Sequence, residues 1–228
     1  MALASGGKMT LSNLFIIWSA LWIALLLVFC FPARAETLPV GSFSKEGLKN
    51  WKTHNFNGET RYRTVVRQGR QVILAESSGS ASALYRELRI DLDKTPYVNW
   101  SWRVHNVISG LDERTKSGDD YPARIYLVTK DGFLPWQSKA VNYVWAGTLP
   151  KETRWNSAFT DSSLMIAVRS GAEEKDVWVR EKRNVKADFQ RFLGRPVRYI
   201  NVIALMSDTD NSGAEVSAEY GNIYFSSD

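Results

Sequence analysis

Oxygen-bearing side chains alternate along one segment near the end of the chain. The segment DTDNSG begins at Asp208, and Glu219 follows six residues after its glycine. This spacing nearly matches the calcium-loop pattern, in which alternate residues supply oxygen ligands and a glycine turns the chain around the ion. The sequence therefore predicts a cation site formed by Asp208, Asp210, Ser212 and Glu219. The flanking residues are typical of strands rather than helices, so a turn stabilised by acidic side chains is the alternative.

Two adjacent carboxylates, Asp119 and Asp120, lie where a polar loop meets an expected strand, and Arg124 follows shortly after them. Such a group can hold a cation or a sugar hydroxyl, because carboxylates accept hydrogen bonds and a guanidinium donates them in pairs. Adjacent acids point to different sides of the chain, so they do not form an acid–base pair by themselves. The alternative is an acidic loop whose charge Arg124 balances.

Aromatic residues fall on alternating faces of the expected strands. Trp100 and Trp102 share one face of a strand with two valines, and we expect this face to be core. If the apolar faces line the core, Arg103, Arg124 and Tyr126 share one outer or concave face.

A second same-face set begins at Trp178, where two basic residues follow at alternate positions. Aromatic rings stack on the CH groups of sugars, and planar polar groups pair with their hydroxyls. The two sets and the two adjacent acids therefore predict ligand-binding residues for a glycan. The alternative is an ordinary solvated sheet face.

Residue sets typical of hydrolytic enzymes are missing from the sequence. The two histidines, His54 and His105, lack a metal-type spacing, and no G-x-S-x-G elbow occurs. Glu87, Asp91 and Asp93 offer a carboxylate pair for glycoside cleavage, but they fit the exposed end of a strand equally well. We therefore predict no catalytic residues and keep an enzyme as an alternative.

Short alternating segments separated by turn residues predict the elements that position these side chains. We expect strands over residues 61–67, 70–75, 83–90, 97–104, 122–129, 140–146, 164–169, 177–183, 197–206 and 216–225. One helix is expected from Asn184, its N-cap, to Leu193, and Gly194 ends it. The pattern predicts an all-β protein: an antiparallel β-sandwich of jelly-roll type with one short helix.

The first 35 residues have the order of a signal peptide, which leaves residues 36–228 as a single β-sandwich domain. The chain is apolar and uncharged from Leu14 to Phe31, and Ala33 and Ala35 fit a cleavage site. We therefore expect a periplasmic or secreted bacterial protein. The alternatives are an inner-membrane anchor formed by Leu14 to Phe31 and, as a weaker match, a lipid attached at Cys30.

Composition narrows the function classes. The chain is 44% hydrophobic and 23% charged, which is ordinary for a globular protein. Outside the leader, 27 basic and 24 acidic side chains give a net charge of +3 without basic runs, and this argues against nucleic acid as a partner. The one cysteine lies in the leader, so a disulfide or a thiolate metal site is excluded after it.

Five ordered motifs make the chain resemble an uncharacterised bacterial family, domain of unknown function 3047. They are WSWRV, GDDYPAR, NYVWA, RNVKADF and DTDN, which begin at Trp100, Gly118, Asn142, Arg183 and Asp208. The resemblance covers nearly all of the chain after the leader and implies no activity. The ending YGNIYF is more weakly similar to galactose-binding-like jelly rolls, but Asn222 replaces their usual Asp and implies no metal ligand there.

Together these patterns predict an exported, non-catalytic glycan-binding or envelope-associated module, with calcium as its one candidate cofactor. A polysaccharide or glycan is the expected partner, nucleic acid is not, and the membrane is one only through an uncleaved leader. Two alternatives stay open. One is a polysaccharide lyase or glycoside hydrolase on a jelly-roll scaffold, and the other is a protein-interaction module of the cell envelope.

Overall fold

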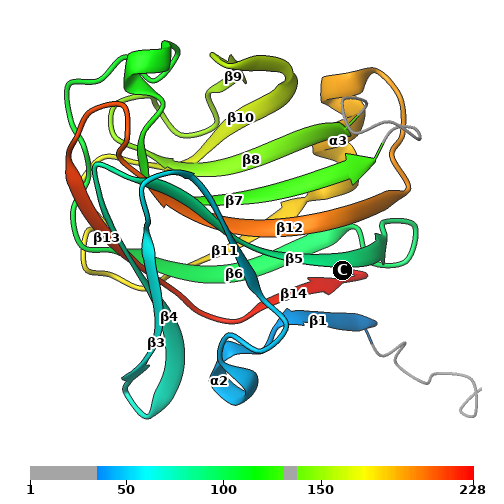
Figure 1. The fold of residues 1–228 in the computed structure, drawn as a ribbon. Helices are drawn as coiled ribbons and strands as arrows, with labels where there is room; N and C mark the ends of the chain where they lie inside the picture. Colours follow the sequence, from blue (N-terminus) through cyan, green and yellow to red (C-terminus); the bar gives the residue numbers. More distant parts are fainter. Residues whose placement is uncertain (1–34, 131–137) are drawn as a thin grey trace, which may run out of the picture. The chain divides into compact units, whose positions relative to one another are not determined.

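Two seven-stranded β-sheets make up the architecture of this protein (Figure 1). The computed structural model describes residues 35–130 and 138–228, so the expected leader lies outside the described residues. Within the described ranges, no helix has both the length and the hydropathy that a membrane span requires. The residues Glu36–Asp228 form one compact unit.

The first sheet is called sheet A and the second sheet B. Sheet A consists of β1 (Thr37–Gly41), β3 (Arg61–Arg67), β4 (Arg70–Ser78), β6 (Tyr97–Val104), β11 (Val179–Asn184), β13 (Glu215–Tyr220) and β14 (Ile223–Ser226). Sheet B consists of β2 (Lys52–Asn57), β5 (Ala81–Asp91), β7 (Tyr121–Lys130), β8 (Ser138–Ala146), β9 (Arg154–Ser157), β10 (Thr160–Ser170) and β12 (Tyr199–Asp208). The helical elements are α2 (Phe43–Glu46), α3 (Val185–Leu193) and the short 3-10 helix η1 (Lys116–Gly118). The predicted all-β sandwich is confirmed.

The strands of sheet B run in the order β2-β5-β12-β7-β8-β10-β9. Its pairs are antiparallel except for β8 and β10, which are parallel. A parallel pair cannot be closed by a tight hairpin, and here the chain forms the edge strand β9 before it returns as β10. In sheet A, β1 and β14 pair along their length, so the first and last strands are neighbours (Figure 1).

The hydrophobic core lies between the sheets and is built from alternate residues of each strand. Trp100 and Trp102 are 2% and 0% exposed, which confirms that both are core residues. Trp100 of sheet A stacks on Tyr143 of sheet B with ring centres 5.5 Å apart. The ring centres of Trp102 and Trp145 lie 5.9 Å apart, with the two ring planes tilted by 59°. Because aromatic rings from both sheets interlock here, the side chains opposite them must point outward.

Local signals explain two further elements. Gln68 and Gly69 join β3 to β4 with φ angles of 48° and 74°, the left-handed conformation that a tight hairpin turn requires. The side chain of Asn184 accepts a hydrogen bond from the amide of Ala187 at 2.9 Å and so caps α3. Gly194 ends this helix with a φ of 69°. Both elements agree with the prediction from sequence.

Candidate functional site

The predicted ligand residues separate onto the two outer faces of the sandwich. Arg103 lies on β6 of sheet A, next to the inward-facing Trp102. Arg124 and Tyr126 lie on β7 of sheet B, on either side of the buried Ile125. The expectation that Arg103 shares a face with Arg124 and Tyr126 is therefore wrong. The two strands belong to different sheets, and side chains opposite a common core point away from each other.

A groove of about 660 Å³ lies on the outer face of sheet B and is called the sheet B groove. Small or apolar side chains of the central strands line its middle: Ala83, Val128, Ala140, Ala204 and Met206. Polar residues gather at one end, where the segment before β7 meets the end of β12. The groove therefore combines an apolar middle with a polar end.

Aromatic rings line both margins of the groove. Phe56 lies on the edge strand β2 and is 64% exposed, and its ring lies nearly perpendicular to the His54 ring with the centres 4.7 Å apart. Phe159 lies between β9 and β10 at the other end of the strand order and is 55% exposed. Tyr85 and Tyr126 add two partly exposed phenols between them. Sequence reasoning found only Tyr126, because Phe56 and Phe159 lie in short polar segments whose alternation is weak.

Arg124 organises the polar end although it is only 2% exposed. Its guanidinium donates hydrogen bonds to both carboxylate oxygens of Asp208 and to the carbonyl of Asp119. It also donates to the phenol oxygen of Tyr126 at 2.7 Å. Burial raises the pKa of Tyr126 to about 12, so this phenol is protonated at neutral pH. Since its oxygen already accepts from Arg124, the phenol proton remains available for a ligand.

Asp119 lines the same end of the groove and is 6% exposed. Its Oδ1 atom has no hydrogen-bond partner within the described ranges, and its Oδ2 atom lies 3.8 Å from Nη1 of Arg124. Burial raises the pKa of this carboxyl, because water is withdrawn from the charged form. A buried acceptor without a donor costs free energy, so a ligand hydroxyl that reached this oxygen would remove that cost. The oxygen is shielded from solvent, so a local movement must uncover it first.

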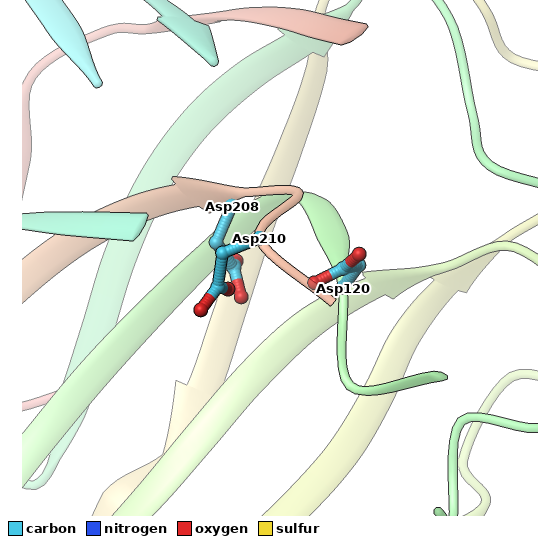
Figure 2. Close-up of side chains that lie close together, drawn as sticks. All are labelled: Asp120, Asp208 and Asp210. Carbon is cyan, nitrogen blue, oxygen red and sulfur yellow. The ribbon is translucent and has the colours of Figure 1, made fainter. Parts of the chain in front are cut away.

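Three carboxylates approach one another beside the groove. Asp120, Asp208 and Asp210 each offer an oxygen within 4.8 Å of the others. Figure 2 shows Asp208, the last residue of β12, beside Asp210 of the following segment, whereas Asp120 comes from the segment before β7. Protein donors already bind two of them: Arg124 binds Asp208, and the backbone amides of residues 211 and 212 donate to Asp120. These bonds describe a closed turn held by acidic side chains.

The predicted metal set is brought together only in part. Asp208 and Asp210 are neighbours, but Glu219 lies on β13 of sheet A. Its carboxylate is fully buried and accepts hydrogen bonds from Arg67 at 2.5 Å and from Arg103. Including Glu219 was wrong, because it faces the outer side of sheet A in register with Arg103.

Ser212 also departs from the predicted ligand role. Its hydroxyl accepts a hydrogen bond from the amide of Ala214, and its own amide donates to Asp120. Both interactions stabilise the loop itself. Cation binding by the three neighbouring carboxylates stays a prediction.

The outer face of sheet A carries its own depression of about 1340 Å³, called the sheet A cleft. Trp178 lines it, and the guanidinium carbon of Arg103 lies 5.4 Å from the centre of this ring. Five basic side chains from three parts of the chain also line it: Lys45 of α2, Arg67 and Arg70 at the β3–β4 turn, and Arg180 and Lys182 of β11. Trp178, Arg180 and Lys182 thus all line this cleft, and their role in glycan binding stays a prediction.

Solved structures with a similar arrangement include proteins that act on or bind carbohydrates. A family 11 carbohydrate-binding module from Clostridium thermocellum has 10% identity and a TM-score of 0.47, with 85% of this chain and 95% of that chain covered. A cellulase derived from Cel12A of Rhodothermus marinus has 11% identity and a TM-score of 0.46, with 82% and 99% covered.

The glycoside hydrolase domain of Endo-D from Streptococcus pneumoniae R6 has 8% identity and a TM-score of 0.41. Here 78% of this chain is covered but only 22% of the other chain. At identities this low the likeness concerns the fold alone.

Sequence comparison gives a more direct result. No curated protein matches the chain. A family model described as "Protein of unknown function (DUF3047)" matches residues 49–224, which include every strand from β2 to β13. Because this match covers most of the chain, the protein belongs to the DUF3047 family.

Proposed function

We propose that this protein binds an uncharged glycan chain in the sheet B groove and does not cleave it. The observation that carries the proposal is the combination of exposed aromatic rings on both margins with a phenol donor and an unpartnered carboxylate oxygen at one end. Sugars present flat CH faces that stack on aromatic rings, and their hydroxyls need both donors and acceptors. Phe56 and Phe159 fit the first requirement, and Tyr126 and Asp119 fit the second.

The charges of the groove favour a neutral ligand. Arg124 is bound to Asp208, and the ammonium of Lys139 donates to the hydroxyl of Ser162 at 3.0 Å. Lys139 keeps its charge, because a hydroxyl does not balance it, but among the described residues three carboxylates and only two cations line the groove. The carboxylates at the polar end would repel an anion unless a cation intervened.

The position of the carboxylates favours binding over hydrolysis. Glycoside cleavage uses two carboxyl groups on opposite sides of the scissile bond, about 5–9.5 Å apart. In the part of the chain that the structure describes, the carboxylates lining the groove are Asp119, Asp208 and Asp210, and all lie at one end. The middle, between Ala83 and Ala140, lacks a carboxylate among its lining residues. The arrangement can hold a sugar chain but offers no flanking acid pair.

Export is part of the proposal and rests on the leader sequence. Cleavage after Ala35 would remove the first 35 residues. Intact mass of the protein recovered outside the cytoplasm tests this, and a species that keeps the leader in the membrane fraction would contradict it.

An array of neutral oligosaccharides, followed by calorimetry with the member retained best, tests glycan binding by the full-length chain. Phe159→Ala should weaken binding about two- to tenfold, because one aromatic contact contributes about 0.5–1.5 kcal/mol. Its melting temperature should stay unchanged, since the ring is exposed. Tyr224→Ala is the matched control, because this ring is 42% exposed but lies on sheet A.

Two outcomes would contradict the proposal. The wild-type chain could retain no neutral oligosaccharide, or Phe159→Ala and Phe56→Ala could both bind as the wild type does. Release of reducing ends during the assay would instead favour the hydrolase alternative.

A further inference from the structure

We propose that the sheet A cleft is a second binding site, which takes an acidic polysaccharide that carries carboxylate or sulfate groups. This site is independent of the neutral glycan groove, because the two lie on opposite outer faces of the sandwich.

Four of the five cations in the cleft form no ion pair with any residue that the structure describes: Lys45, Arg70, Arg180 and Lys182. All four are exposed. Neighbouring like charges repel one another, so a negatively charged chain laid among them lowers the electrostatic free energy. The fifth cation, Arg67, is already bound to Glu219.

The only carboxylate among the residues lining the cleft does not neutralise these cations. It belongs to Glu181, whose side chain is 8% exposed and accepts a hydrogen bond from Arg169 at 2.5 Å. Alternation along β11 directs Glu181 to the opposite side from its neighbours Arg180 and Lys182. The cleft therefore keeps an excess of positive charge.

Neutral polar groups lie between the cations. On β6, Ser101 is in register with Arg180 and Asn99 with Lys182. These two cations are separated by one residue on the same face, about 7 Å apart along the strand. Asn222 lines the cleft at the break between β13 and β14. Amide and hydroxyl groups beside positive charges suit a ligand that alternates hydroxyls with anions.

Two aromatic rings complete the set. Trp178 and Tyr224 both line the cleft, and Tyr224 is 42% exposed. The Lys182 ammonium also lies 4.8 Å from the centre of the Tyr97 ring, which holds this cation against the sheet. Aromatic surface next to unpaired cations is the combination that an acidic sugar can use on its CH face and on its anionic group together.

The shape of the surface favours a polysaccharide over other polyanions. The cations surround a concave space bounded by the β3–β4 turn and α2, which lie beside each other in Figure 1. A bilayer is flat and would reach only the rim of such a space. The net charge of +3 after the leader is low for a nucleic-acid-binding protein.

Polygalacturonate is the test probe, and calorimetry with the full-length chain at low salt is the measurement. Binding should occur at low salt and fall strongly in about 1 M sodium chloride, where the Debye length is about 3 Å. The double variant Arg180→Gln/Lys182→Gln should weaken binding by about tenfold or more, since it removes two charged donors. The control Lys151→Gln/Arg191→Gln removes the same charge from exposed residues that do not line the cleft, and it should bind as the wild type does.

Further experiments distinguish the kind of anionic group that is recognised and distinguish the cleft from the groove. Chondroitin sulfate in place of polygalacturonate distinguishes sulfate from carboxylate recognition. Phe159→Ala should retain full polygalacturonate binding, so failure of the groove and failure of the cleft can be told apart. The proposal is overturned if methyl-esterified polygalacturonate binds equally well or if the cleft variant binds like the wild type. Tighter binding of single-stranded DNA or of phosphatidylglycerol vesicles through the same two cations would also overturn it.

Discussion

The sheet B groove and the sheet A cleft use charged side chains in opposite ways. In the groove, Arg124 is buried, and its guanidinium donates hydrogen bonds to Asp208, Asp119 and Tyr126. In the cleft, Arg180 and Lys182 are exposed and have no acidic partner within the described ranges. A cation close to a binding site can therefore have one of two roles. It can hold the side chains of the site in place, or it can remain free to bind a charged ligand. Only burial and hydrogen bonding distinguish the two roles.

The largest expected effect tests whether Arg124 builds the groove. Arg124→Met leaves the buried Asp208 without its partner, and such a change costs about 3–5 kcal/mol of the free energy of unfolding. The same substitution at Arg180, whose side chain is exposed, should change it by no more than about 0.5 kcal/mol. Urea unfolding of both variants measures the difference. If both variants lose the same free energy of unfolding, Arg124 has no larger structural role than Arg180.

A second prediction concerns the buried charge cluster formed by Glu219, Arg67 and Arg103 next to the cleft. Glu219→Gln removes a fully buried carboxylate that binds Arg67 and Arg103, and we expect a loss of about 2 kcal/mol of stability. Glu76→Gln is the matched control, because the Glu76–Arg63 pair is 40% and 50% exposed and such pairs contribute about 0–1 kcal/mol. Denaturant midpoints of the two variants should differ accordingly. If Glu76→Gln loses as much stability as Glu219→Gln, burial does not determine how much each ion pair contributes.

A smaller effect follows from the raised pKa of Asp119. A carboxyl whose pKa is higher in the folded state stabilises the fold while it is protonated, below its unfolded pKa. That contribution is lost as the pH rises from about 3.8 through the folded pKa. The stability of the wild type relative to Asp119→Asn should therefore fall over this range. Unfolding of both proteins at several pH values measures it, with Asp161→Asn as the control for loss of one exposed acid. A rise in this difference with pH would contradict the assignment.

The smallest expected effect is that of calcium. Because protein donors already bind Asp208 and Asp120, we expect calcium to bind the three carboxylates only weakly, so that calcium near its dissociation constant raises the melting temperature only slightly. A bound ion at one hundred times its dissociation constant would add about 2.7 kcal/mol. A calcium-dependent rise that disappears in Asp210→Asn would establish a cation site beside the groove, and an unchanged melting temperature in excess calcium would contradict it.

Elements with strong local signals were predictable from sequence. The strand from Tyr97 to Val104 alternates large apolar and polar residues, and its observed bounds are the same. The hairpin at Gln68 and the helix capped by Asn184 depend on residues that are adjacent in the chain. In each case the information lies within about ten residues, which is the range over which periodicity and capping act.

Both edge strands of sheet B were missed because their residues carry little local information. β2 has the sequence KTHNFN, and all six of its residues are exposed. It forms a strand because it pairs with β5, not because it alternates. β9 is four residues long and pairs with β10 at the other edge of sheet B. Strands at an edge depend on their neighbour, which the sequence alone does not identify.

The candidate sites were predictable only in part for a related reason. Arg124 and Asp208 were each noted, but they are 84 residues apart, and no spacing rule joins them. The separation of Arg103 from Arg124 depends on which sheet each strand enters. Alternation predicts which side chains point outward from a strand. It does not predict which outer face of a sandwich they share.

The pairing of β1 with β14 has a consequence for protein engineering. Thr37 is in register with Ser226, and the amide of Ser227 donates to the carbonyl of Glu36 at 3.0 Å. A linker of a few residues should therefore join Asp228 to Glu36, and new termini could be opened at the exposed turn at Gln68. Such a circular permutant would keep every strand pair, so the sandwich should not require its strands to be synthesised in the natural order.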